Sequence, residues 1–104
     1  MYVIVCQDMP LRHQAVQACH AGIAAGKDLI EVDNPYLVLL TIPTQHELIE
    51  LSTSLTKAGV AHRVFHEADM GGRATALATG CVTEEQRQLF AGMPLYGARA
   101  KVAA

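Results

Sequence analysis

The hydrophobic residues of the chain fall into short runs separated by proline, glycine and aspartate. Two of these runs, residues 2–6 and 36–42, are continuous rather than alternating, which is typical of strands covered on both faces. Two later runs, 60–65 and 74–79, stand on either side of a Gly-Gly turn at 71–72. That turn predicts an antiparallel pair, so the pattern predicts four strands in total.

Between the first two strands, apolar residues recur at every fourth position and predict a helix over roughly residues 12–25. Pro10 can open this helix because its missing N–H would be unpaired there, and Gly26 ends it. We expect the repeating residues to form a buried stripe, with Cys19 in the core. The stripe consists of Leu11, Ala15, Cys19 and Ile23, with Ala18 and Gly22 beside it.

Two capping boxes predict two further helices, because in each box a threonine and a Glu or Gln can satisfy free N–H groups at a helix start. The first box is Thr44 to Glu47, and Gly59 ends the helix that follows it. The second box is Thr83 to Gln86, and Gly92 and Pro94 end its short helix. The apolar positions expected to face the core are Leu48, Leu51, Leu55 and Ala58 in the first helix and Leu89 and Phe90 in the second.

The predicted order is therefore β-α-β-α-β-β-α, an α/β fold. Helices that alternate with strands imply a sheet covered by helices on both faces. No repeat or linker divides the chain, so we expect one domain over residues 1–96. Residues 97–104 are small and weakly basic and are expected to form a flexible tail.

The composition predicts a soluble, cytoplasmic protein. With 104 residues, 51% of them hydrophobic, the chain is expected to be a single globular domain. It shows no run long enough to span a bilayer and no signal peptide. Its net charge of −2 gives no basic field that would attract nucleic acid. Cys6, Cys19 and Cys81 form no disulfide framework and no zinc pattern, which favours a reducing compartment and no metal.

Several enzyme classes lack their sequence signals. No G-x-S-x-G elbow is present, and Ser52 and Ser54 fall in the middle of a predicted helix with no base beside them, which argues against a serine hydrolase. Neither a P-loop nor a G-x-G-x-x-G dinucleotide loop occurs. We therefore expect no nucleotide cofactor.

Polar residues on the first helix form one candidate site. At 100° per residue, His13, Gln17 and His20 lie within about 60° of one another, opposite the predicted apolar stripe. Such a face can present a base and an amide to a substrate, or it can simply be a solvated helix surface. The spacing alone favours the solvated surface.

The turn after the third strand is a second candidate. Strand ends are where covered sheets bind ligands, although a charged hairpin loop in water is the more common structure. His62 and His66 share a strand face but stand roughly 13 Å apart, too far to hold one metal ion. The charged and imidazole side chains that gather at this turn are Arg63, His66, Glu67, Asp69 and Arg73.

The ordered series of short motifs resembles the type II (archaeal and eukaryotic) peptidyl-tRNA hydrolases. The resemblance covers residues 2 to about 96 and rests on five segments. They are Gln17-Ala18-Cys19-His20-Ala21, similar to the family's Q-x-x-H-A; the strand Tyr36 to Ile42 followed by the Glu47-Leu48 helix; Ala58-Gly59-Val60; Thr75 to Gly80, similar to T-x-L-x-I-G; and Leu95-Tyr96. It implies an α/β sandwich on a mixed four-stranded sheet, a homodimer, and cleavage of the ester between a peptide and tRNA without metal or cofactor.

The resemblance also implies the site residues. The family's Gln falls on Gln17, its Lys on His13, its Asp on Glu67, and its hairpin Thr is nearest to Thr75. The chain thus departs from the family at the Lys and the Asp, in a shorter hairpin, and in most of the basic residues before the helix. We predict these four residues as catalytic; the residues expected to contact substrate are Arg12, His20, His66 and Arg73.

Three hypotheses about function follow. In the first, His13 is the base, Gln17 donates to the developing oxyanion and Glu67 orients water or holds an imidazolium, so that a tRNA-linked acyl ester is hydrolysed. In the second, the lost Lys and the missing basic residues leave a binding module that docks a protein or small ligand. In the third, the chain serves mainly as a symmetric structural dimer.

Overall fold

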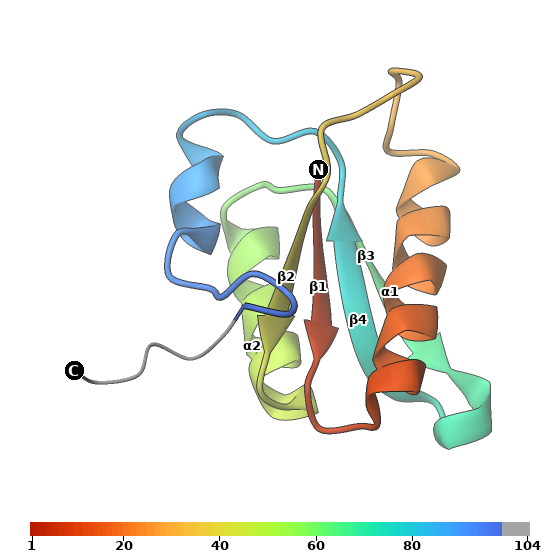
Figure 1. Ribbon diagram of the computed structural model, residues 1–104. Helices are drawn as coiled ribbons and strands as arrows, with labels where there is room; N and C mark the ends of the chain where they lie inside the picture. The colour runs from red at the N-terminus through yellow and green to blue at the C-terminus, as the bar shows by residue number, and fades with distance from the viewer. Residues whose placement is uncertain (99–104) are drawn as a thin grey trace.

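The structure, a computed structural model, describes residues 1–98 and contains one mixed four-stranded sheet between two helices (Figure 1). The strand order is β2-β1-β4-β3; β1 and β2 are parallel, and β4 is antiparallel to both of its neighbours. Along the chain the elements are β1 (Tyr2–Cys6), α1 (Leu11–Gly26), β2 (Val38–Ile42), α2 (Gln45–Lys57), β3 (His62–Glu67) and β4 (Arg73–Thr79). The predicted strands and first two helices are confirmed, although β2 and β3 begin two residues later than expected.

The predicted third helix is wrong in type. Residues Gln86–Phe90 form a short 3-10 helix, η2, instead of an α-helix. Its capping box does form, because Thr83 and Gln86 exchange two hydrogen bonds of 3.0 and 3.2 Å. Phe90 is buried and stacks on Tyr2, whereas Leu89, expected to point inward, is exposed. This segment therefore adds one aromatic anchor to the core.

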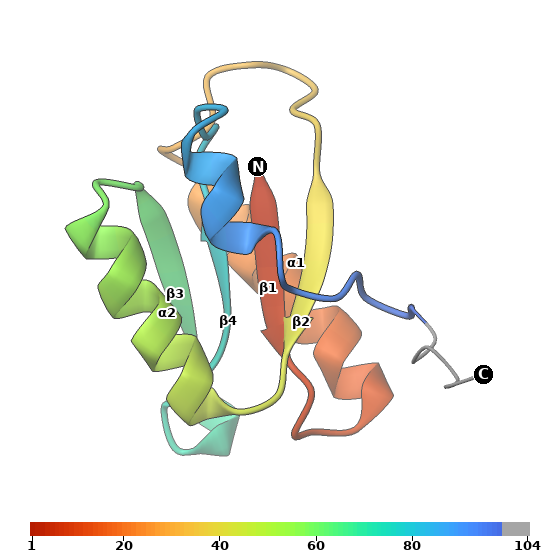
Figure 2. The same cartoon turned by 90° about the vertical axis from the view of Figure 1, so that its left-hand side faces the viewer.

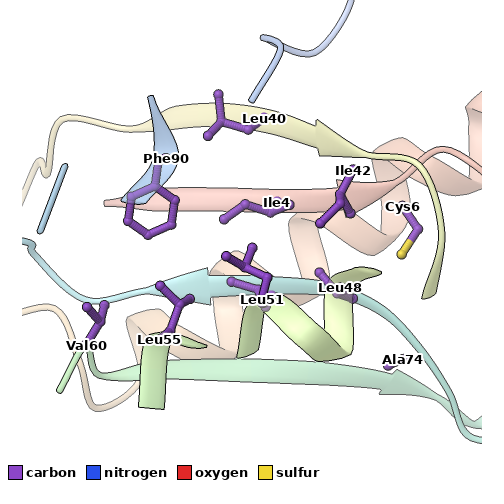
Figure 3. Packing of buried hydrophobic residues seen from close by; sticks show 11 residues of the cluster. Ile4, Cys6, Leu40, Ile42, Leu48, Leu51, Leu55, Val60, Ala74 and Phe90 are labelled. Atoms are coloured by element: carbon purple, nitrogen blue, oxygen red, sulfur yellow. The ribbon is translucent and has the colours of Figure 1, made fainter. Parts of the chain in front are cut away.

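One face of the sheet is covered by α2 (Figure 2), which contributes large aliphatic side chains to the core. Leu48, Leu51 and Leu55 are buried as the spacing predicted, but Ala58, which was also predicted to face the core, is exposed at the C-cap of the helix. Thr44 caps the first turn by accepting from the N–H of Glu47. Figure 3 shows the resulting cluster, in which the α2 leucines meet Ile4, Leu40 and Phe90.

The opposite face is covered by α1, and here the predicted buried stripe is wrong. Leu11 is 71% exposed and Ile23 60% exposed, and Cys19 is exposed rather than in the core. The helix is rotated so that small and polar residues meet the sheet. The buried residues of α1 are Gln14, Gln17, Ala18, Ala21 and Ala25.

This rotation follows from small side chains on both sides of the interface. The alanines of α1 pack on Val3 and Val5 of β1 and on Ala76 and Ala78 of β4. Small residues on both elements let the helix backbone approach the sheet closely. Gln14 is buried without loss because its amide donates to the carbonyl oxygens of Gln7 and Met9, in the loop before the helix.

The chain after η2 returns to the edge of the sheet. The carbonyl of Pro94 accepts from the Thr41 N–H, and the Tyr96 N–H donates to Leu39, so this segment pairs with β2. Of the predicted tail at 97–104, only Gly97 and Ala98 lie within the described residues, and both are exposed. Within residues 1–98, no helix is long and apolar enough to cross a bilayer.

Candidate functional site

A buried glutamine joins α1 to the two strands of the hairpin. Gln17 is 4% exposed; its Nε2 donates to Glu67 Oε2 at 3.0 Å, and its Oε1 accepts from the Thr75 hydroxyl at 2.6 Å. A carboxylate can only accept, so the amide nitrogen must face Glu67 and the oxygen must face Thr75. Three residues predicted as catalytic are therefore brought together at one point.

Thr75 reaches this point because of an irregularity in the sheet. Phe65 pairs with Ala76 and His66 pairs with Ala74, so Thr75 is an extra residue in β4. Such a bulge breaks the strict alternation of side chains. Regular alternation would turn Thr75 toward α2 together with Leu77; the bulge instead turns it toward Gln17 on the α1 side.

Glu67 ends β3 and is held as an anion. Its Oε1 accepts from the backbone N–H of Asp69, which belongs to the 3-10 turn η1 (Ala68–Met70). The hydrogen bond from Gln17, then that from Asp69, and a smaller attraction to His20 keep the pKa of the Glu67 carboxyl below its ordinary value. Glu67 is therefore ionised at neutral pH, and it is suited to orient and stabilise a cation rather than to take up a proton.

Two imidazoles stand at the rim of a hollow above these residues. The hollow has a volume of about 270 Å³ and lies between α1 and the turn after β3. His20 is exposed and stacks on Phe65, with ring centroids 4.6 Å apart. His13 is half-buried, and its Nδ1 is buried with no hydrogen-bond partner among residues 1–98. The lining residues are His13, Val16, Gln17, His20, Glu67, Asp69 and Met70.

The spacing of His13, Gln17 and His20 favoured a solvated helix surface, and the structure shows that this interpretation is wrong. Gln17 is buried and His13 partly so, and both face the turn beyond β3. Sequence reasoning missed Val16 and Met70 as lining residues. A signal for Val16 existed: it lies three residues after His13 and four before His20, on the same side of the helix.

The other predicted contact residues do not line the hollow. Arg73 pairs with Asp8 in the loop after β1. The Nδ1 atom of His66 lies 3.1 Å from the Gly72 carbonyl oxygen and its ring is outside the hollow, and Arg12 is exposed elsewhere on the first turn of α1. Arg63, from the same predicted charged cluster, pairs with Asp28. Around this hollow the described cations are therefore engaged with carboxylates or turned away, and none lines it.

One negative prediction needs correction. Ser52 does have a base beside it, because its Oγ lies 2.7 Å from Nε2 of His62, whose Nδ1 is 2.8 Å from the Val60 carbonyl oxygen. The carbonyl fixes the tautomer, so the hydroxyl donates to Nε2. Ser52 lies inside α2, where backbone N–H groups are bonded within the helix, so an oxyanion hole cannot form beside it. The pair therefore fastens α2 to β3.

The remaining observations identify neither a metal site among the described residues nor a family for the chain. Within residues 1–98, no three His, Cys, Asp or Glu side chains are grouped closely enough to hold a metal ion. Compared with models of known protein families and with curated protein sequences, the chain matches none. The resemblance to the peptidyl-tRNA hydrolases therefore stays a prediction, and the geometry of the hollow carries the functional argument.

Proposed function

We propose that the chain hydrolyses an acyl ester in the hollow between α1 and the β3–β4 turn. The observation that supports this best is that the imidazole of His13, whose buried Nδ1 has no hydrogen-bond partner among residues 1–98, lines the same hollow as Gln17 and Glu67. A buried polar atom without a protein partner is where a water molecule or a substrate atom completes the hydrogen bonding. Imidazole is also the side chain whose ordinary pKa lies nearest neutral pH.

In the proposed reaction, His13 accepts a proton from water as the water oxygen bonds to the ester carbonyl carbon. The second N–H of Gln17 Nε2, the one not bonded to Glu67, donates to the carbonyl oxygen as it becomes negative. The tetrahedral intermediate then breaks its bond to the alcohol oxygen, and the His13 imidazolium returns the proton to that oxygen. Glu67 stabilises the transient imidazolium, and Thr75 fixes the orientation of the Gln17 amide.

The resemblance specifies the ester as the one that joins a peptide to tRNA, and we carry that substrate into the proposal. The departures at His13 and Glu67 keep a base and a carboxylate at the matching positions. Because no Lys or Arg of the described residues lines the hollow, the affinity for the tRNA phosphates is expected to be low, since each lost phosphate contact lowers that affinity in a salt-dependent way. The homodimer that the resemblance implies is tested by sedimentation over a range of protein concentrations.

The decisive experiment is turnover of peptidyl-tRNA by the purified chain and by His13→Ala. If His13 is the base, the variant loses roughly 10²–10⁴-fold in rate and keeps the melting temperature of the parent. His46→Ala is the matched control, because His46 is exposed on α2, where it pairs with Glu50. Absence of turnover above buffer by the parent chain overturns the proposal.

A second candidate is a binding module of the same fold. It is favoured by the absence of Lys and Arg from the lining of the described hollow, which is unusual for a site that must hold a tRNA end. In that case the parent shows no turnover, and His13→Ala and Glu67→Ala change the affinity for a partner instead. Isothermal titration with uncharged tRNA and with small esters separates the two candidates.

A further inference from the structure

The exposed side of α1 is more apolar than a solvated helix face needs to be. Ile23, which was predicted to be buried, is instead 60% exposed, and Val16 on the same side of the helix is 51% exposed. Cys19 lies between them and is also exposed. Positions 16, 19 and 23 are spaced by three and four, so these side chains form one continuous apolar ridge along the helix.

On one side of this ridge lies an apolar groove between α1 and the β1–β2 edge of the sheet. Its volume is about 480 Å³. Its floor is open at Gly22, where an added Cβ would meet no atom within 4 Å. None of its lining side chains is charged, and the amino group of Met1 donates to the Tyr36 carbonyl oxygen, so the groove suits an uncharged apolar occupant. The lining residues are Met1, Val3, Ala18, Cys19, Gly22, Ile23, Leu37 and Leu39.

On the other side of the ridge lies the hollow of the proposed reaction. Val16 lines the hollow, and Cys19 and Ile23 line the groove. From Val16 to Ile23 the helix rises only about 10 Å. A chain attached to a carbonyl in the hollow therefore meets an unbroken apolar path over the ridge and into the groove.

We propose that this path receives the acyl part of the substrate, so that the chain acts on esters of extended apolar acyl groups. The inference rests on the proposed function and names its substrate class. In keeping with the proposed substrate, the acyl group is the apolar end of a peptide, and a preference for a hydrocarbon chain is the alternative outcome of the test. Burial of each methylene in the path raises kcat/KM by roughly two- to fourfold.

Binding can be tested without turnover, because the chain carries its own reporter thiols. Cys19 lines the groove, Cys81 lies exposed in a different depression, and Cys6 is buried, which raises the pKa of its thiol to about 11. Iodoacetamide therefore labels Cys19 and Cys81. Octanamide is expected to slow labelling of Cys19 several-fold and to leave Cys81 unchanged, whereas acetamide protects neither.

Gly22→Glu and Gly26→Glu form a matched pair of variants. Both glycines lie in α1 with open space around them, but only Gly22 lines the groove. Gly22→Glu is expected to abolish the protection of Cys19 by octanamide, and Gly26→Glu to retain it. The same pair is then compared on butyryl, octanoyl and N-acetyl-leucyl-leucyl esters of one alcohol, which separates the hydrocarbon source from the peptide source.

The outcomes distinguish the two proposals. Turnover that does not change with acyl length, with Cys19 unprotected, overturns the apolar path and leaves the esterase standing. Protection of Cys19 without any turnover overturns the esterase and supports the path as a binding site. If Cys19 becomes protected as protein concentration rises and octanamide adds nothing, a second copy of the chain covers the groove and the acyl proposal is wrong.

Discussion

The two helices bury different kinds of side chain against the sheet. On one face of the sheet, α2 contributes leucines that are almost fully buried against Ile4, Leu40 and Leu77. On the other face, α1 contributes three alanines and two glutamines, and its larger apolar residues point outward. The sheet therefore has one face that is a thick hydrocarbon core and one that is thin, closely packed and partly polar.

This difference separates the face that stabilises the fold from the face that holds the candidate site. Burial of large aliphatic side chains supplies most of the favourable free energy of folding, so the α2 face stabilises the sheet. The α1 face buries less hydrocarbon but holds Gln17 between Glu67 and Thr75. A buried polar group is tolerated when it is hydrogen-bonded, and the two hydrogen bonds of Gln17 fix the geometry of the hollow.

The largest expected effect is on the α2 face. Leu55→Ala removes a side chain with no exposed surface and is expected to lower the free energy of unfolding by about 2–5 kcal/mol. Chemical denaturation measures the change. Ile49→Ala, on the exposed side of the same helix, is the control and should change stability by less than about 0.5 kcal/mol. Equal losses in both variants would contradict the assignment of the core to this face.

A smaller effect of a different kind is expected on the α1 face. Thr75→Val keeps the shape of a fully buried residue but removes the hydroxyl that donates to Gln17. The unpaired amide oxygen should cost about 1–3 kcal/mol, and turnover should fall because Gln17 loses its orientation. Thr75→Ser keeps the hydroxyl and should retain turnover. A neutral Thr75→Val would show that hydrocarbon alone holds α1 in place.

The smallest effect is the pH dependence of the Glu67 contact. The pKa of Glu67 is lowered in the folded chain, mainly by the hydrogen bond from Gln17. Its stabilising contribution is therefore complete above the ordinary value of 4.5 and is lost as pH falls through the lowered folded value. The stability difference between the parent and Glu67→Gln should shrink over that acid range. Carboxyl titration by NMR checks the cause, and a Glu67 that titrates above 4.5 would contradict it.

Much of the fold could be predicted from local signals. The strands, the Thr44 cap, the leucine spacing of α2 and the Gly71–Gly72 turn each depend on residues that are close in sequence. The rotation of α1 could not be predicted in this way. Both sides of that helix are apolar enough to be buried, and the choice between them depends on the small residues of β4 and on the Glu67 carboxylate, which are distant in sequence.

The candidate site shows the same division. The spacing of His13, Gln17 and His20 placed them on one side of α1, and the strand end placed Glu67 and Asp69 in one turn. They line one hollow only because α1 packs on the sheet beside the turn that follows β3. Arg73 was predicted beside them but pairs with Asp8, 65 residues away in sequence, and such a partner cannot be read from neighbouring residues.

By itself, the sequence determined an α/β domain with four strands, a leucine-rich second helix and a set of polar residues capable of acid–base chemistry. The tertiary structure decided which side of α1 is buried, and through the bulge in β4 it decided that Thr75 faces Gln17 rather than α2. Periodicity records only how often a residue type recurs along one element. Which face becomes the interior depends on close approach and hydrogen-bond satisfaction between elements, and both arise only when the elements pack together.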